Sequence, residues 1–172
     1  MNILVVGLGL IGASLAKTLK KNTKHHIMGW NRTESVSLRA VSDGAIDETG
    51  ELCDLIPKAD ITIVNFYPDA IVPFIKDNRD LFKKNSIVTD SCGIKTKICT
   101  ELEKESFNFF FVGGHPMAGR EVSGYDNSLD TLFDKASFIF TPLSSTPRYI
   151  TDALVGLAQE MGFACTVVIT PE

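Results

Sequence analysis

The sequence predicts one α/β domain, residues 1–172, built on a doubly wound, mostly parallel β-sheet. Three observations lead to this fold class. Short β-branched runs alternate with helical stretches along the whole chain. The apolar runs are continuous rather than alternating, which is typical of strands covered on both faces. A glycine-rich turn separates the first apolar run from the first helical stretch.

The predicted strands are short apolar runs rich in Val, Ile and Phe. ILVV opens the series, and ITIVNF, FFFV and FIFT are later examples. In chain order, we expect strands at residues 3–6, 26–30, 61–66, 86–89, 109–112, 138–141 and 164–169.

The stretches between these runs have helical character. In chain order, we expect helices at residues 10–21, 34–43, 69–82, 96–104 and 147–161. Pro147 suits the first turn of the last helix, because a helix leaves the N–H of that position unpaired in any case. Gly162 suits the end of the same helix.

The composition is that of an ordinary globular protein, with 44% hydrophobic and 22% charged residues. A net charge of −4 gives no basic surface for nucleic acid and no polybasic anchor for a membrane. No apolar run reaches the roughly 18 residues that a membrane span requires. The N-terminus also lacks the basic segment of a signal peptide. We therefore expect no nucleic-acid partner and no membrane partner.

The cysteines do not form a metal-binding pattern. Cys53, Cys92, Cys99 and Cys165 make no CxxC pair, and no histidine lies at ligand spacing beside them. We expect reduced cysteines, no metal site and a cytoplasmic location.

The first predicted strand leads into the hexapeptide GLGLIG, residues 7–12, which has the GxGxxG pattern. A strand precedes it, a helix follows it and a second strand comes about 20 residues later, as a dinucleotide-binding unit requires. Gly7 would allow the tight turn, Gly9 the approach of a pyrophosphate, and Gly12 close helix–strand packing. The helix N-terminus at Leu10 and Ile11 would offer N–H groups to the phosphates. The pattern predicts a Rossmann-like dinucleotide-binding domain.

The second predicted strand ends at Asn31-Arg32-Thr33, where NAD-specific sites carry an acidic residue that binds the ribose hydroxyls. Asn31 is neutral and would not repel a 2′-phosphate. Arg32 can pair with that phosphate, and the Thr33 hydroxyl can donate to it. These residues favour NADP over NAD, although an arginine on a solvated surface is the alternative for Arg32.

The strand predicted at residues 61–66 is followed by further candidates for the dinucleotide site. Ligands of doubly wound sheets lie beyond the carboxyl ends of the strands, so Asn65 and Tyr67 should flank the dinucleotide. Tyr67 would be either a wall of the site or an anchor of its loop.

His115 follows the strand predicted at residues 109–112, at the same sheet edge as the glycine turn. Gly113 and Gly114 leave room for a cofactor or substrate, and Pro116 restricts the backbone of His115. An imidazole there can accept a proton from an alcohol while hydride leaves. The alternative is a histidine that only packs its loop. His25 and His26 are interpreted as structural.

Four segments together resemble the prephenate/arogenate dehydrogenases of tyrosine biosynthesis. They are VVGLGLIGASLA at the start, TDSCGIKT at residues 89–96, GGHPMAGREVSG at 113–124 and LFDKASFIFTP at 132–142. The resemblance spans the whole chain, and GGHPMAG is its most specific element.

The resemblance implies oxidative decarboxylation of prephenate or of its amino counterpart, arogenate. Hydride passes from C4 to the nicotinamide, the ring carboxylate leaves as carbon dioxide, and His115 binds the 4-hydroxyl and serves as base. In this family a helical domain follows, which forms the dimer and supplies substrate contacts. This sequence ends after CTVVITPE without that domain. We therefore expect an N-terminal fragment of a homodimer that has little activity by itself.

Three further positions are weaker candidates for substrate contacts. Gly93 stands where many relatives have a serine that orients the histidine, so its N–H or a water would have to substitute. Lys95 would face the site, or else be a solvated lysine at a helix N-terminus. Arg120 would attract the anionic substrate, or else form a salt bridge at the rim.

Two other functions fit the glycine turn. A β-hydroxyacid dehydrogenase or related reductase would place a lysine base in a following domain and would not need GGHPMAG. A non-catalytic dinucleotide sensor would use the same fold to bind a partner protein. Loss of turnover on replacing His115 would separate these functions from a prephenate or arogenate dehydrogenase.

Overall fold

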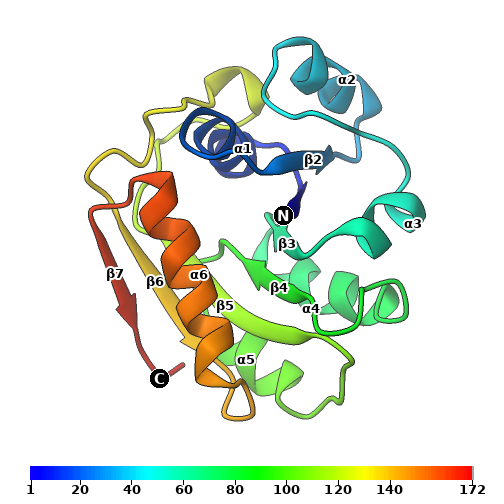
Figure 1. The fold of residues 1–172 in the computed structure, drawn as a ribbon, viewed down its shortest axis with the longest axis vertical. Coiled ribbons are helices and arrows are strands. Elements are labelled where there is room, and N and C mark those ends of the chain that lie inside the picture. Colours follow the sequence, from blue (N-terminus) through cyan, green and yellow to red (C-terminus); the bar gives the residue numbers. More distant parts are fainter. Residues whose placement is uncertain (172) are drawn as a thin grey trace.

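The computed structural model describes residues 1–171 and folds them around one seven-stranded sheet (Figure 1). The strands are β1 (Asn2–Val6), β2 (His26–Trp30), β3 (Ile61–Val64), β4 (Ile87–Asp90), β5 (Phe110–Pro116), β6 (Ser137–Pro142) and β7 (Cys165–Val168). The helices are α1 (Leu10–Asn22), α2 (Glu34–Ser42), α3 (Leu52–Leu55), α4 (Pro68–Asp77), α5 (Thr96–Leu102) and α6 (Arg148–Met161), with 3₁₀ turns η1 (Ile56–Lys58) and η2 (Tyr125–Asn127). Every predicted strand and helix is present, and α3 and the two 3₁₀ turns are additions.

The strand order is β2-β1-β3-β4-β5-β6-β7, and every neighbouring pair is parallel except β5 with β6. The chain leaves β1 toward β2 on one side and later returns to place β3 on the other side of β1. This reversal is the switch point of a doubly wound sheet, and the carboxyl ends of β1 and β3 frame a crevice there. The predicted α/β class with a mostly parallel sheet is confirmed.

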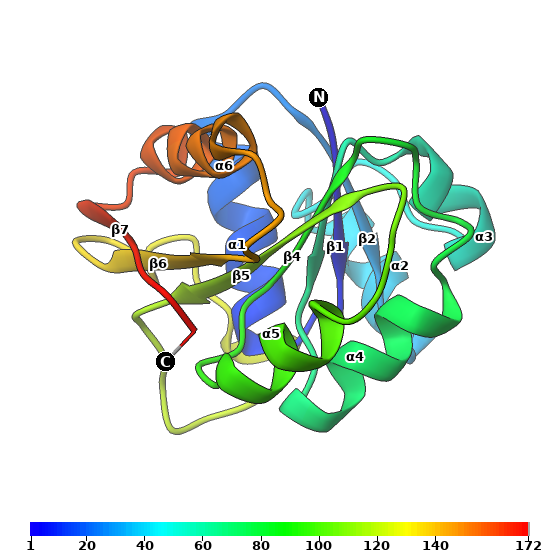
Figure 2. The same ribbon diagram turned by 90° about the horizontal axis from the view of Figure 1, so that it is seen from below.

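Two hydrophobic clusters bury the two faces of the sheet. Helices α1 and α6, with the buried side of α2, cover one face, where Leu15, Ala40 and Leu154 belong to the same cluster. Helices α3, α4 and α5 cover the other, where Leu55, Ile75 and Leu102 pack. Figure 2 shows α1 and α6 on one side of the strands and α4 and α5 on the other. Because both faces are covered, every residue of β3 and β4, and every residue of β1 after Asn2, is buried.

Most element boundaries differ from the prediction by one or two residues, and two larger differences have local reasons. Helix α4 ends at Asp77 rather than residue 82, because the Asn78 side-chain amide donates to the Phe74 carbonyl oxygen at 2.8 Å. Strand β5 continues to Pro116, because β6 pairs with it antiparallel beyond the end of β4, with His115 opposite Ile139. His115 therefore lies within a strand and not in the loop that the sequence predicted.

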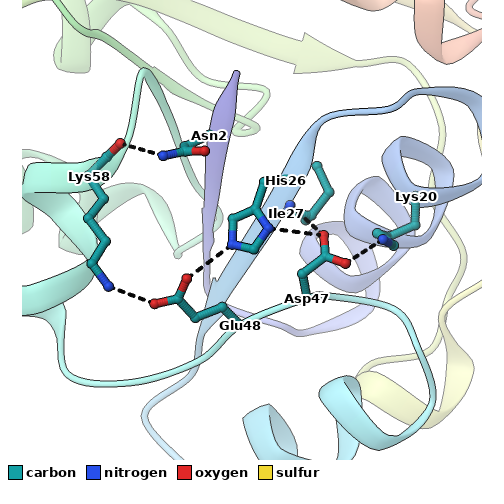
Figure 3. A network of polar contacts seen from close by, with 7 residues as sticks. All are labelled: Asn2, Lys20, His26, Ile27, Asp47, Glu48 and Lys58. Carbon is teal, nitrogen blue, oxygen red and sulfur yellow. Dashed lines mark hydrogen bonds and ion pairs between the residues drawn. The ribbon is translucent and has the colours of Figure 1, made fainter.

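The amino ends of the strands, opposite the crevice, carry a polar network (Figure 3). Glu48 accepts hydrogen bonds from Lys58 at 2.7 Å and from the His26 ring at 3.0 Å, and Lys20 pairs with Asp47 at 2.5 Å. The segment that carries both acids runs beside β2 and covers the edge of the sheet, since the Gly29 N–H donates to the Glu48 carbonyl oxygen. His26 thus has the structural role that the sequence indicated.

This network should make the free energy of unfolding depend on pH in the acidic range. The hydrogen bonds from Lys58 and then from His26 hold the pKa of Glu48 below its ordinary value of 4.5. A lowered pKa means that the contribution of Glu48 is complete above pH 4.5 and is lost as the pH falls through the folded-state pKa. We expect Glu48→Gln to lower the free energy of unfolding by up to about 1 kcal/mol at pH 6, the range for solvent-accessible ion pairs.

Urea unfolding of wild type and variant at pH 6 and pH 3 measures this effect, and the two stabilities should converge at pH 3. Glu51→Gln is the matched control, because Glu51 is exposed and has no ion pair within the described residues. A wild-type–variant difference that is the same at both pH values would contradict the expectation.

Candidate functional site

A cleft of about 860 Å³ opens at the carboxyl ends of the strands, at the switch point between β1 and β3. Its wall includes all the residues predicted to bind the cofactor, namely Gly7, Gly9, Leu10, Ile11, Gly12, Asn31, Arg32, Thr33, Asn65 and Tyr67, together with Arg120. The tertiary structure adds Trp30, Leu52, Phe66, Ala70, Phe74, Ser91, Cys92, Gly119, Val122, Ser123 and Gly124. Segments far apart in the chain thus meet in one hollow.

The glycine turn holds the start of α1 against the end of β1. Gly7 has a φ of +88°, which favours glycine, and its N–H donates to the Trp30 carbonyl oxygen at 2.7 Å. A Cβ atom on Gly12 would lie 1.9 Å from the carbonyl oxygen of Gly7, so no side chain fits there. The position of a Cβ on Gly9 meets nothing within 4 Å, which leaves that part of the cleft open.

The N-terminus of α1 presents unpaired N–H groups at the cleft wall. The first helical hydrogen bond runs from the Ala13 N–H to the Gly9 carbonyl oxygen, so the amides of Leu10, Ile11 and Gly12 precede it. No acidic side chain occupies the first turn. The partial positive charge of the helix N-terminus is therefore uncompensated, which suits a phosphate group.

The loop after β2 leaves one cation free at the cleft wall. The Asn31 side chain is turned inward, where its Oδ1 accepts from the Leu8 N–H at 3.0 Å and its Nδ2 donates to the Thr33 carbonyl oxygen. Arg32 is exposed and has no ion pair or hydrogen bond to any other described residue. The exposed Thr33 precedes α2, and its hydroxyl makes no capping bond. Arg32 and Thr33 are free to bind an anion.

The loop after β3 forms the opposite wall. The Asn65 amide donates to the carbonyl oxygens of Val6 and Ile63, at 3.1 and 3.0 Å, while its own Oδ1 is buried and has no partner among residues 1–171. Tyr67 is 86% exposed, so it lies on the wall and does not anchor its loop. An unpartnered acceptor at the cleft is a feature that a bound donor would complete.

An aromatic surface beside this loop was not predicted from the sequence. Phe66 packs edge-on against Trp30, with ring centroids 6.5 Å apart, and against Phe74 at 5.2 Å. All three residues line the cleft next to the glycine turn. The signal in the sequence was an aromatic residue at or just after the ends of β2 and β3, and the structure shows that these ends are neighbours of β1. The surface can hold the flat ring of a ligand.

His115 lies beside the cleft but is not among the residues that line it. Its half-buried imidazole abuts Gly93, where a Cβ atom would be 3.2 Å from Cε1 and 3.5 Å from Nε2 of the ring. Gly93 directly follows the lining residues Ser91 and Cys92. The Nδ1 atom is buried and has no hydrogen-bond partner within the described residues. His115 therefore lies against Gly93, the residue that directly follows the lining residues Ser91 and Cys92.

Lys95 is not the solvated lysine at a helix N-terminus that the sequence offered as the alternative. It is only 9% exposed and forms an ion pair with Asp90, which is fully buried. Burial raises the pKa of Asp90, against the opposing influence of Lys95. Burial also raises the pKa of the nearby Cys99 thiol to about 11, which keeps that thiol protonated. Lys95 is thus turned away from solvent and is not on the cleft wall.

Arg120 does line the cleft, and its Nη1 donates to the Asn127 carbonyl oxygen at 3.2 Å. No carboxylate of residues 1–171 pairs with it, so the rim salt bridge is absent from the described structure.

The described part of the chain offers neither a metal-binding cluster nor a membrane-spanning helix. No cluster of three or more histidine, cysteine or acidic side chains within residues 1–171 is arranged to hold a metal ion. Among the same residues, no helix combines the length and the apolar character that crossing a bilayer requires.

The doubly wound sheet, the glycine turn and the cleft at the switch point define a nucleotide-binding domain. The family described as prephenate dehydrogenase, nucleotide-binding domain, matches residues 15–166, and the chain belongs to this family. The predicted resemblance is therefore confirmed.

Relatives with known names support this assignment. Prephenate dehydrogenase from Lactococcus lactis is 33% identical over 157 residues, which is 88% of this chain and 44% of that protein. Arogenate dehydrogenase from Synechocystis has a crystal structure that matches 99% of this chain and 60% of its own, with a TM-score of 0.90 and 32% identity. The Aquifex aeolicus prephenate dehydrogenase, in complex with hydroxyphenyl propionate and NAD+, matches with a TM-score of 0.87 and 28% identity over 99% of this chain and 60% of its own. The chain spans about half the length of the L. lactis protein.

The glycine turn can be tested by adding a single methyl group. We expect Gly12→Ala to destabilise the protein by about 1–3 kcal/mol, the usual cost of overpacking, because the backbone oxygen of Gly7 cannot move aside easily. The shift of α1 should also weaken nucleotide binding. Urea unfolding and a titration with NADP+ measure the two effects.

Gly156→Ala is the matched control, since Gly156 lies in α6 and a Cβ there meets nothing within 4 Å. It should leave nucleotide affinity unchanged and raise stability by up to about 1 kcal/mol through helix propensity. If Gly12→Ala and Gly156→Ala had the same stability and the same nucleotide affinity, the contact at Gly12 would not be tight.

Proposed function

We propose that this chain is the cofactor-binding part of an NADP- or NAD-dependent dehydrogenase that oxidatively decarboxylates prephenate or arogenate in tyrosine biosynthesis. The observation that carries the proposal is the placement of His115. In a chain of the prephenate dehydrogenase family, this histidine abuts the segment that forms one end of the cleft. This proximity of the imidazole to a lining segment of the cleft supports the proposed role of His115 as base.

The residues of the cleft fit a dinucleotide. The helix N-terminus at Leu10–Gly12 and the open space at Gly9 suit a pyrophosphate. The aromatic surface of Trp30, Phe66 and Phe74 suits a flat base. The unpartnered oxygen of Asn65 adds an acceptor for a ligand donor.

The chemistry asked of the protein is limited. A bound nicotinamide dinucleotide supplies the acceptor for the hydride that leaves C4 of the substrate. His115 accepts the proton of the 4-hydroxyl, and the ring carboxylate then departs as carbon dioxide as the ring becomes aromatic. The Gly93 N–H or a water takes the place of a side-chain hydroxyl beside the imidazole. The protein must also hold C4 of the substrate in position beside the bound nicotinamide.

NADP is the favoured cofactor in this proposal. Arg32 is unpaired within the described residues and stands at the end of β2, where the 2′-position of the adenosine ribose lies in this fold class. Asn31 carries no charge and is engaged with Leu8, so no carboxylate of that loop opposes a phosphate. The exposed Thr33 hydroxyl supplies a second donor.

The remaining parts of the enzyme are proposed from its longer relatives. The matched structures extend well beyond the aligned region, and this chain covers 60% of the Synechocystis protein. We propose that a helical domain of the same enzyme supplies most substrate contacts and the homodimer interface. A cytoplasmic location accords with four cysteines that are all free in the structure.

The cofactor preference can be tested at Arg32. We expect Arg32→Ala to raise the dissociation constant of NADP+ by about tenfold or more, since a hydrogen bond to a charged group contributes about 1.5–3 kcal/mol. The dissociation constant of NAD+ should change little, because NAD+ lacks the 2′-phosphate. Calorimetric titration of both nucleotides measures this, with Arg148→Ala, an exposed arginine on α6, as control. Tighter binding of NAD+ than of NADP+ by the wild type would overturn the preference.

The catalytic role can be tested at His115. We expect His115→Asn to lower turnover of prephenate or arogenate by about 10²–10⁴-fold, the usual contribution of acid–base catalysis, with cofactor binding retained. The assay uses this chain and the longest natural chain that carries it, and follows reduced nicotinamide by absorbance. An unchanged rate would defeat the assignment of His115. If the longest natural chain in its wild-type form binds nucleotide but turns over neither substrate, a dinucleotide sensor would be supported instead.

A further inference from the structure

Asp90 ends β4, and its buried carboxylate receives three donors. Its Oδ1 accepts from the Gly114 N–H at 3.1 Å, and its Oδ2 accepts from the Cys92 N–H at 2.9 Å and from the Lys95 ammonium. Asp90 is 0% exposed and Lys95 is 9% exposed. The Asp90 side chain thus connects the end of β4 both to β5 and to the loop that follows β4.

Both of these connections reach residues that contact or adjoin His115. Gly114 directly precedes His115 in β5, so its N–H bond to Asp90 fixes the backbone that carries the imidazole. The other connection holds the loop from Ser91 to Lys95, and Gly93 of that loop lies against the ring. The Lys95 stem packs over Gly113, where a Cβ atom would be 2.8 Å from the lysine Cδ.

The His115 ring has no hydrogen bond to any described residue that would hold it in place. The Nδ1 atom of His115 is buried and unpartnered within residues 1–171, so no carboxylate or carbonyl orients the imidazole through that atom. Its orientation rests on the strand that carries it and on the loop that packs against it. Both of these are attached to the same carboxylate.

A buried ion pair adds little net stability, because the cost of desolvating both charges offsets most of their attraction. The Asp90–Lys95 pair does supply a defined geometry, with a strand amide, a loop amide and an ammonium converging on one group. The Lys95 ammonium is held at the buried carboxylate, and Lys95 is not among the residues that line the cleft.

We propose that the Asp90–Lys95 pair positions His115 at the end of the cleft, an inference that rests on the proposed role of His115 as base. The pair acts through the Gly114 backbone and through the loop at Gly93. It does not touch the reacting atoms, so both members are positioning residues.

The first test observes His115 directly and needs no turnover. The chain has three histidines, so the imidazole signals of His25, His26 and His115 can be assigned by NMR with a His115→Asn sample. In Lys95→Met we expect the His115 ring signals to shift or broaden and the Gly114 amide to lose protection from hydrogen exchange. Lys95→Arg keeps the charge and should restore both. His25 and His26 should keep their signals throughout.

Lys97→Met is the matched control, because Lys97 lies two residues further on and pairs at the exposed surface with Asp69. It should leave the His115 and Gly114 signals unchanged. If Lys95→Met does not fold, the double variant Asp90→Asn/Lys95→Met removes both buried charges while keeping an acceptor for the Gly114 N–H. That variant should still alter the His115 ring signals. Unchanged His115 and Gly114 signals in a folded Lys95 variant would overturn the proposal, even if thermal stability fell.

The second test uses turnover by the longest natural chain that carries this domain. We expect Lys95→Met to lower kcat by about 10²-fold, as a misplaced catalytic group does, with the KM for the cofactor unchanged. In a His115→Asn background the same change should have almost no further effect, because the two residues act through one group. Additive effects would overturn the positioning role. If His115→Asn alone left the rate unchanged, the proposed function would fail, while the NMR test would still decide whether the pair positions the ring.

Discussion

The absence of a side chain at Gly12 is the constraint on which the cleft depends. With 1.9 Å between the Gly7 carbonyl oxygen and the position of a Cβ atom, α1 approaches the end of β1 as closely as a backbone permits. This approach aims the N-terminus of α1 at the switch point between β1 and β3. The unpaired amides, the inward-turned Asn31 and the loop after β3 then surround one hollow. A larger residue at position 12 would move the helix and open this arrangement.

The far end of the hollow depends on a different interaction, the antiparallel pairing of β5 with β6. Strand β4 accompanies β5 only as far as Val112, and β6 supports it from there to Pro116. This extra length carries His115 past the end of β4, to the loop that contains Gly93. The buried Asp90 links that loop to β5 through the Gly114 amide. Two neighbouring strands and one carboxylate thus define the place of the imidazole.

The residues proposed to bind the cofactor and the residue proposed as base come from separate parts of the domain. The side chains that suit the dinucleotide come from the loops after β1, β2 and β3, whereas His115 and its supports come from β4, β5 and β6. The polar network of Glu48 lies at the opposite ends of the strands and stabilises the sheet edge without contact with the cleft. Changes to the Glu48 network can therefore alter stability without altering the cleft, whereas a change at Gly12 affects both.

The sequence alone determined the fold class, the strands, the glycine turn and the cofactor candidates, because these depend on local patterns: continuous apolar runs, glycine spacing and the residues that follow each strand. Tertiary structure decided what depends on contacts between distant segments. It extended β5 to include His115, since a strand end depends on its partner and β6 lies far along the chain. It gathered Trp30, Phe66 and Phe74 into one surface, since β2 and β3 both neighbour β1. It also buried Lys95, which looked like a solvated or site-facing residue, because only the folded chain brings the Asp90 carboxylate, the Gly114 amide and the space over Gly113 around its side chain.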